Sequence, residues 1–398
     1  MPLDSLSRRT IAFVNIAHAL DHFVLLIYPT AVIAIAAERQ LSYASLIGLS
    51  TGAFVAFGLF SLPMGWIADR IGRRNLLGIF FGGCGIACLG ISTANSPVMF
   101  GIWLFVLGVF SAIYHPIGST MLVTHTSRLG RDLGINGVWG NLGAAFASGI
   151  TALLAASLGW RAAFILPGFV CLVAGITFIS LVPGDRDPHG KTDSAHAVIP
   201  LTRPMTLLLL FATAIIAGGM TFNIMTIALP KIIDERAGTA LPMVVIGSLA
   251  TLVFVFGALT QLLMGRLVDR YTLPRIFVSL SILQPLGLGL AALTSGIPML
   301  VGLTLAMAAI YGQVVVNDAM VARYVPFQYR ARAFSVRYFL GFTTSGLAVP
   351  LIALLHGMSG FTLVLSAAAT FGTVIFLCSL GFFLAAQGSS EPSSLLAR

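Results

Sequence analysis

Long apolar stretches alternate with short polar ones along the whole chain. Twelve of these stretches reach the roughly 20 residues that an α-helix needs to cross the apolar core of a bilayer. The expected spans are residues 10–37, 44–67, 76–95, 97–123, 134–158, 161–182, 204–229, 242–265, 274–294, 297–322, 333–356 and 360–386. The pattern therefore predicts an all-α membrane protein with twelve transmembrane helices, the first of them retained as a helix.

A polar stretch in the middle of the chain separates six spans from six. It runs from Gly184 to Arg203 and is the longest hydrophilic run in the sequence. The motif MGWIADR at residues 64–70 also recurs as MGRLVDR at residues 264–270, 200 positions later. Many secondary transporters are built from such repeats. We expect two pseudo-symmetric six-helix bundles, residues 1–183 and 204–398, joined by a cytoplasmic linker, residues 184–203.

Composition supports this interpretation and excludes several classes of protein. Of the 398 residues, 58% are hydrophobic and only 9% are charged, against about 25% charged in a soluble domain. Too few charges are present to cover the surface of a soluble enzyme, a disordered regulator or a nucleic-acid-binding module. The four cysteines all lie within apolar runs, and the chain has no P-loop for ATP. We expect no enzyme activity, no cofactor and no nucleic-acid partner.

The distribution of cations predicts the orientation. With the N-terminus inside, 17 of the 22 Lys and Arg residues fall in cytoplasmic segments and four fall in outer loops. This bias matches the positive-inside rule, so both termini are expected in the cytoplasm. The formal net charge of +9 is then a consequence of topology.

The strongest motif is GWIADRIGRR at residues 65–74, on the cytoplasmic turn between the second and third spans. Glycines permit a tight turn and a close approach of helices. The carboxylate of Asp69 is placed to meet the positive end of a helix or an arginine, which would hold the cytoplasmic side shut. The expected gate residues are Gly65, Asp69, Arg70, Gly72, Arg73 and Arg74, with Gly265, Asp269 and Arg270 in the second copy.

This arrangement resembles the major facilitator superfamily, whose signature between helices two and three has the form G-x-x-x-D-R-x-G-R-R. The resemblance covers the whole chain and includes Gly159-Trp160-Arg161 at the start of the sixth span. The second copy departs from the signature, because Thr272-Leu273-Pro274 replaces its Gly-Arg-Arg end. The resemblance implies a secondary transporter that works by alternating access.

A finer resemblance points to the fosmidomycin-resistance branch of bacterial drug:proton antiporters. It rests on four short motifs: Leu20-Asp21, Tyr28-Pro29, Tyr114-His115-Pro116 and Gly140-Asn141-Leu-Gly143. It implies proton-coupled efflux across the bacterial inner membrane. Two features depart from that pattern: Leu104 stands near the place of the arginine that many proton-coupled members carry in helix four, and the antiporter Gly-Pro pair of helix five is absent.

Ionisable residues at membrane depth indicate where such a protein binds protons and substrate. An Asp at the centre of a span costs about 2.5–3.5 kcal/mol on insertion scales, so it is expected to serve a function. Asn15, His18, Asp21 and His22 share an arc of about 120° on the first helix, with Asp21 near mid-membrane. Burial favours the protonated carboxyl, and an imidazole exchanges protons near neutral pH. Asp21 and its histidines are the predicted proton-coupling site.

Other polar residues within spans are expected in the same cavity. His115 in the fourth span is a second proton or substrate contact, or a structural hydrogen-bond partner. Asp318 and Arg337 are expected either to pair near the cytoplasmic surface or to leave Arg337 for an anionic substrate group. Gln313 and Asn317 share a face of the tenth span and are expected in the cavity. Asn136, Asn141 and Asn223 are expected to line the cavity or to form hydrogen bonds between helices.

Three alternatives to proton-coupled efflux remain open from the sequence. The first is proton-coupled uptake of an organic anion. The second is transport of a divalent metal, with His18, Asp21, His22 and His115 as ligands. The third is a membrane receptor built on a transporter scaffold, since a fold does not fix a function. The expected partners are a small-molecule substrate, protons and the lipid bilayer, and the expected state is a monomer.

Overall fold

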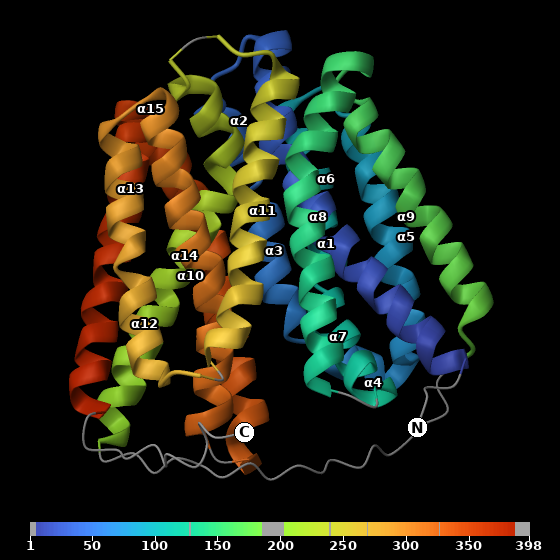
Figure 1. The fold of residues 1–398 in the computed structure, drawn as a ribbon. Helices are drawn as coiled ribbons and strands as arrows, with labels where there is room; N and C mark the ends of the chain where they lie inside the picture. Colours follow the sequence, from blue (N-terminus) through green and yellow to red (C-terminus); the bar gives the residue numbers. More distant parts are fainter. Residues whose placement is uncertain are drawn as a thin grey trace. The chain divides into compact units, whose positions relative to one another are not determined.

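A computed structural model describes residues 5–126, 129–184, 203–238, 240–268, 270–325 and 327–386. Every regular element within these residues is an α-helix (Figure 1). The helices are α1 (Ser5–Arg39), α2 (Tyr43–Gly48), α3 (Thr51–Ser61), α4 (Met64–Ile71), α5 (Arg73–Ser92), α6 (Pro97–Ser111), α7 (Tyr114–His125), α8 (Leu129–Leu158), α9 (Ala162–Leu181), α10 (Pro204–Arg236), α11 (Met243–Val268), α12 (Leu273–Ser281), α13 (Leu283–Leu293), α14 (Gly296–Tyr324) and α15 (Phe327–Ala386). The expected linker, apart from Gly184 and Arg203, and the expected gate residue Asp269 lie outside the described residues.

Eleven helical segments of the described chain are long and apolar enough to cross a membrane. The last of them, Phe339–Ala386, has 48 residues, about twice the length of one crossing. Its backbone leaves the helical conformation at Ser359 and at Gly360, where φ is +64°. α15 therefore contains two helices, as the sequence predicts, and the predicted all-α membrane fold is confirmed.

Three of the predicted spans are interrupted rather than continuous. Proline has no amide hydrogen, and its ring collides with the carbonyl group four residues earlier. Pro116 accordingly follows a break at residues 112–113 between α6 and α7, and Pro285 follows the end of α12 at Ser281. Pro63 lies at the break between α3 and α4. The break before α7 lies next to Tyr114 and His115, two residues of the candidate site.

The described helices form two compact units. One contains α1 to α9 together with the first turns of α11, and the other contains α10, the rest of α11 and α12 to α15. In the first unit, α1 packs along α8 and α5 packs along α9 (Figure 1). In the second unit, α10 packs along α15, and α13 packs against both α14 and α15.

Two glycines of the Gly140-Asn141-Leu-Gly143 motif explain the close approach of α8 to α1. A Cβ atom at Gly143 would overlap the backbone carbonyl oxygen of Ala19. A Cβ atom at Gly140 would lie 2.5 Å from Nε2 of His18. These positions therefore need glycine if the polar face of α1 is to lie directly against α8.

The first helix of each unit ends in the same Glu-Arg pair, which is a further repeat between the two halves. Arg39 at the end of α1 donates to the backbone oxygen of Asn95 (3.1 Å), and Arg236 at the end of α10 donates to that of Thr294 (2.8 Å). In each unit an arginine thus ties the end of the first helix to a loop, which follows α5 in the first unit and α13 in the second.

Candidate functional site

The ionisable residues of α1 meet His115 of α7 inside the first unit. Asp21 is completely buried, and its Oδ2 atom lies 3.5 Å from Nε2 of His115. The buried hydroxyl of Ser111 on α6 also lies close to the Asp21 carboxyl. The ring of His18 lies 5.0 Å from that of His22 and 5.4 Å from that of His115, measured between ring centres. The structure thus brings together four of the residues that the sequence singled out.

Asn136 on α8 organises one side of this cluster. Its side-chain amide donates to Oδ1 of Asn15 (2.9 Å), and its Oδ1 atom accepts from the hydroxyl of Tyr114 (3.1 Å). The ring of Tyr114 stacks on that of His18, with their centres 4.8 Å apart. The predicted cavity residues Asn15 and His18 are therefore held from α8 by a single buried side chain.

The surroundings of His18 determine which of its ring nitrogens carries the proton. Nδ1 lies 2.8 Å from the backbone oxygen of Asn136 and 2.9 Å from its Oδ1 atom. A backbone oxygen can only accept, so Nδ1 must be the donor. In the neutral ring Nε2 then carries the lone pair, which is available to bind a proton or another ligand.

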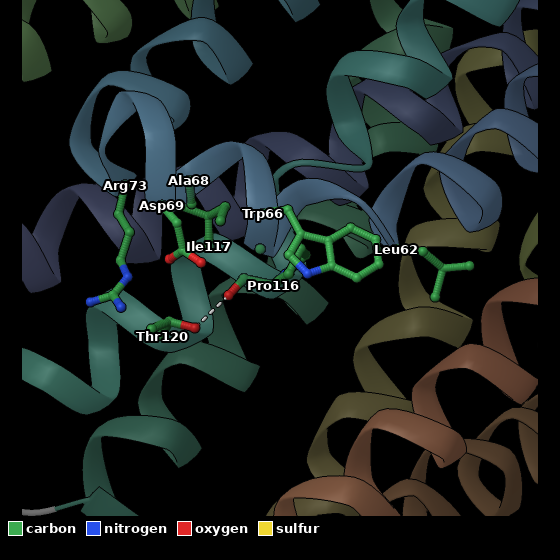
Figure 2. A pocket seen from close by; sticks show the side chains of 9 residues that line it. Leu62, Trp66, Ala68, Asp69, Arg73, Pro116, Ile117 and Thr120 are labelled. Carbon is green, nitrogen blue, oxygen red and sulfur yellow. Dashed lines mark hydrogen bonds between the residues drawn. The ribbon is translucent and has the colours of Figure 1, made fainter.

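The gate motif forms a turn and one wall of a pocket in the first unit. Gly72 links α4 to α5 with φ at +85°, a conformation that L side chains rarely adopt. Asp69 and Arg73 line a pocket of about 340 Å³. In Figure 2 both side chains lie near Thr120 of α7, whose hydroxyl donates to the backbone oxygen of Pro116 (2.7 Å). By contrast, a Cβ atom at Gly65 would have no neighbour within 4 Å.

Two other arginines of the motif have different surroundings. Arg70 is exposed, whereas Arg74 reaches the end of α9. The Nε atom of Arg74 donates to the backbone oxygen of Val182 (2.8 Å), and its NH2 atom donates to that of Ile179. Because the last carbonyl groups of a helix lack partners within the helix and carry partial negative charge, a cation stabilises them. Arg74 therefore caps α9 within its own unit.

The second copy of the motif has a different turn. Gly265 lies within α11, and a Cβ atom there would also have no neighbour within 4 Å. The exposed Arg270 lies in the turn after α11. Thr272 precedes α12 with φ at −67°, so this turn does not need the conformation that Gly72 adopts. The end of α11 is capped by Arg323 of α14, which donates to the backbone oxygen of Val268 (2.7 Å).

The second unit contains a buried cluster of amides and hydroxyls. Thr221 of α10 donates to Oε1 of Gln284 on α13 (3.2 Å), and Gln284 donates to Oε1 of Gln313 on α14. All three are at most 2% exposed. Asn317 lies one turn after Gln313 and is 8% exposed. Nε2 of Gln313 and Oδ1 of Asn317 are buried without a hydrogen-bond partner.

Asn223 and Arg337 complete the predicted residues of the second unit. Asn223 of α10 donates to the backbone oxygen of Gly219 (2.8 Å) and to the hydroxyl of Thr344 (3.3 Å). Arg337 pairs with Asp318 at 2.5 Å, so its charge is neutralised by a carboxylate of the protein itself. In the first unit, Asn141 is half-buried on α8.

Gln284, which links two helices of the second unit, was not among the predicted site residues. A polar residue next to a proline within an apolar span was the available signal. Asn136 was predicted only as a cavity-lining or hydrogen-bonding group, and Tyr114 was named only as part of a motif. Their central position depends on the packing of α7 and α8 against α1, which no local pattern reveals.

Comparison with known proteins decides the family. The family model described as Major Facilitator Superfamily matches residues 11–244 and again residues 210–397. The chain belongs to the Major Facilitator Superfamily. It is therefore a multi-pass membrane protein of a transporter family, and the expectation that it is not an enzyme is confirmed, because this family is not one of enzymes.

Known members of the superfamily share only part of their length with this chain. It is 27% identical over 261 residues to the multidrug efflux pump LfrA of Mycolicibacterium smegmatis, covering 62% of this chain and 50% of LfrA. It is 27% identical over 177 residues to the membrane sensor protein UhpC of Escherichia coli, covering 42% of this chain and 39% of UhpC. It is 26% identical over 155 residues to the probable sulfoacetate transporter SauU of Cupriavidus necator, covering 36% of each. The matches span half or less of each relative.

Solved structures agree on the superfamily fold. A bacterial homologue of the human lysosomal transporter Spinster, crystallised in an inward-facing and occupied conformation, aligns with a TM-score of 0.79 over 98% of this chain and 100% of that one. The inward-facing and unoccupied form of that homologue aligns with a TM-score of 0.71 over 96% of this chain and 99% of the homologue. Sequence identity is 14% in both cases, so the likeness concerns the fold alone.

Proposed function

We propose that this protein exports a small organic molecule across the bacterial inner membrane by alternating access, in exchange for protons. In this proposal both termini lie in the cytoplasm, the protein acts as a monomer, and the domains are the two predicted bundles, residues 1–183 and 204–398. The gate motif at residues 65–74 controls the cytoplasmic side.

The observation that carries the proposal is the buried carboxyl of Asp21. It is completely buried near the middle of α1, 3.5 Å from His115. A carboxylate at this depth is costly unless it is protonated or paired. Asp21 therefore exchanges a proton with the adjacent imidazole as the cavity opens to one side or the other.

The second unit supports a different part of the same function. The buried amides of Gln313 and Asn317 have unpartnered polar atoms, and such atoms favour hydrogen bonds to a polar group of a ligand. We assign them to substrate contact together with Asn223. The residues that bind protons and those that bind substrate then lie on different bundles.

One of the three relatives supports export, whereas the membrane sensor protein UhpC fits a receptor and the third relative fits uptake. LfrA is named a multidrug efflux pump, whereas SauU is named a probable sulfoacetate transporter, which fits uptake of an organic anion. Uptake of an anion would need a cation for the substrate. Arg337 was the candidate, but Asp318 already neutralises it at 2.5 Å. This pair favours export over anion uptake.

A pH-gradient assay tests the proposal. Everted membrane vesicles that contain the protein are acidified inside, and the gradient is followed with a pH-sensitive fluorescent amine while drugs from a chemically diverse panel are added outside. An antiporter releases protons as it takes up a drug, so at least one compound should collapse the gradient. A proton symporter for uptake would not respond to compounds added on this side.

Matched variants connect the assay to the site. Asp21→Asn should lose the response, whereas Asp234→Asn, which removes an acid paired with Lys231 at the end of α10, should keep it. If Asp21→Asn responds like the parent protein, Asp21 is not the coupling group.

A further inference from the structure

His18, His22 and His115 converge in a way that the proton-coupling proposal does not require. Each ring offers one nitrogen atom such that all three atoms lie within 4.8 Å of one another. His18 and His22 are one helical turn apart on α1, so they project from the same face. His115 approaches them from α7, where the break at residues 112–113 starts a new helix.

We propose that these three histidines form a binding site for a divalent transition-metal ion of the zinc class. The inference goes beyond the proposed transport function and does not depend on it. Imidazole nitrogens bind zinc, nickel and copper ions, whereas magnesium and calcium prefer oxygen ligands. A site of three histidines with a further open position is a familiar form of zinc site.

The ring positions fit a bound ion. With zinc–nitrogen bonds of about 2.0–2.1 Å and near-tetrahedral angles, the three nitrogens lie about 3.4 Å apart and the ring centres about 5 Å apart. The observed distances between ring centres are 5.0, 5.4 and 5.6 Å. The rings are therefore spaced as an ion would require, and small rotations of the side chains bring the nitrogens together.

The groups behind the histidines also fit. Metal-binding histidines usually donate their other ring nitrogen to a backbone oxygen or a carboxylate, which fixes the tautomer and the orientation of the ring. Nδ1 of His18 donates to the backbone oxygen of Asn136 at 2.8 Å, so its Nε2 atom carries the lone pair that could bind a metal. Asp21 is not one of the converging ligands, but it lies 3.5 Å from His115 and its negative charge would offset that of the ion.

Packing alone explains less of this arrangement. Histidine rings often pack in a core next to aromatic side chains, and Tyr114 and Phe57 lie against this cluster. Packing requires neither three histidines with converging nitrogens nor a backbone oxygen that fixes the tautomer of His18. A metal ion accounts for both features.

Metal binding by the purified full-length protein tests the inference. The protein in detergent is stripped with a chelator, equilibrated with ZnSO4 and freed from unbound ion, and zinc is measured by mass spectrometry. We expect about one zinc per chain, and no retention of magnesium in a parallel sample. Co²⁺ in place of zinc should give the visible absorption of a low-symmetry nitrogen site.

Substitutions identify the ligands. His22→Gln and His115→Gln should each weaken zinc binding at least about tenfold, because each removes one of the three ligands. His125→Gln is the matched control, because His125 lies on α7 outside the cluster and contacts the backbone oxygen of Met121. Zinc binding that is absent in the parent protein, or unchanged in His22→Gln, would overturn the inference. Neither result bears on drug-driven proton release through Asp21, so the metal site and the proposed transport function can be contradicted independently of each other.

Discussion

The polar clusters of the two units differ in kind although both lie midway along the first helix of their unit. In the first unit, α1 carries His18, Asp21 and His22, all of which can change charge. In the second unit, α10 carries Thr221 at the corresponding depth, joined to the neutral amides of Gln284 and Gln313. Both clusters are buried, but only the first can bind protons or metal ions.

The difference indicates how the two halves divide one task. A charged group within a membrane span is expensive, so each is kept only where its charge is used or neutralised. In the second unit, Asp318 and Arg337 neutralise each other at 2.5 Å. In the first unit, Asp21 faces histidines that are themselves titratable. We infer that the first unit changes its charge state during transport and that the second unit recognises the substrate by shape and hydrogen bonds.

The largest expected effect tests this division directly. Asp21→Asn should abolish drug-driven proton release while the purified protein still binds the drug, because the amide keeps the volume of the carboxyl but cannot exchange a proton. Binding is measured by the shift in thermal unfolding on addition of the responsive drug. Loss of binding as well would place Asp21 among the substrate contacts and end the proposed division.

A substitution in the second unit should produce the opposite pattern. Gln313→Leu replaces the amide by an apolar side chain of similar size. It should raise the half-saturating drug concentration about tenfold, which is the effect of losing about 1.4 kcal/mol of hydrogen bonding. Proton release at saturating drug should be retained. A variant that loses coupling with unchanged half-saturation would reverse the roles of the two units.

Stability provides a third comparison. Asn136→Ala should destabilise the protein by about 1–3 kcal/mol, because the buried side chains of Asn15 and Tyr114 each lose a partner. Gln284→Ala should cost a similar amount, since it separates Thr221 from Gln313. Unfolding in detergent, followed by circular dichroism, measures both. The exposed Asn75, which bonds the backbone oxygen of Ile71, offers a control, and Asn75→Ala should stay within about 0.5 kcal/mol of the parent protein.

The sequence predicted the fold well because span length and hydropathy are local properties. Every predicted span corresponds to between one and three helical segments among the described residues. The breaks before Met64, before Tyr114 and after Ser281 were missed, although Pro63, Pro116 and Pro285 signal them. Proline within membrane helices is common enough that a kink and a break cannot be distinguished from the sequence alone.

The candidate site was predicted only in part, and the reason is again physical. His18, Asp21 and His22 stood out because charged and polar side chains are rare in an apolar span. The approach of His115 from α7 and the hydrogen bonds of Asn136 depend on how α7 and α8 pack on α1. The role of the repeated Glu-Arg pair could not be predicted, because Arg39 and Arg236 contact loop residues that lie 56 and 58 positions further along the chain.

The smallest expected effect concerns the turns that the two halves derive from one repeat. Gly72 has φ at +85°, and Thr272, at the corresponding position, has φ at −67°. Gly72→Ala should therefore destabilise the protein by about 1–2 kcal/mol, because φ at +85° with ψ at 143° lies in a region of backbone conformation that is open essentially to glycine alone. Thr272→Ala should stay within about 0.5 kcal/mol, as should Gly65→Ala, which meets open space. If Gly72→Ala and Gly65→Ala lower the free energy of unfolding in detergent equally, the backbone conformation of Gly72 is not the cause of the loss. A loss at Gly72 alone would show that the two copies of the motif have diverged in their backbone as well as in their sequence.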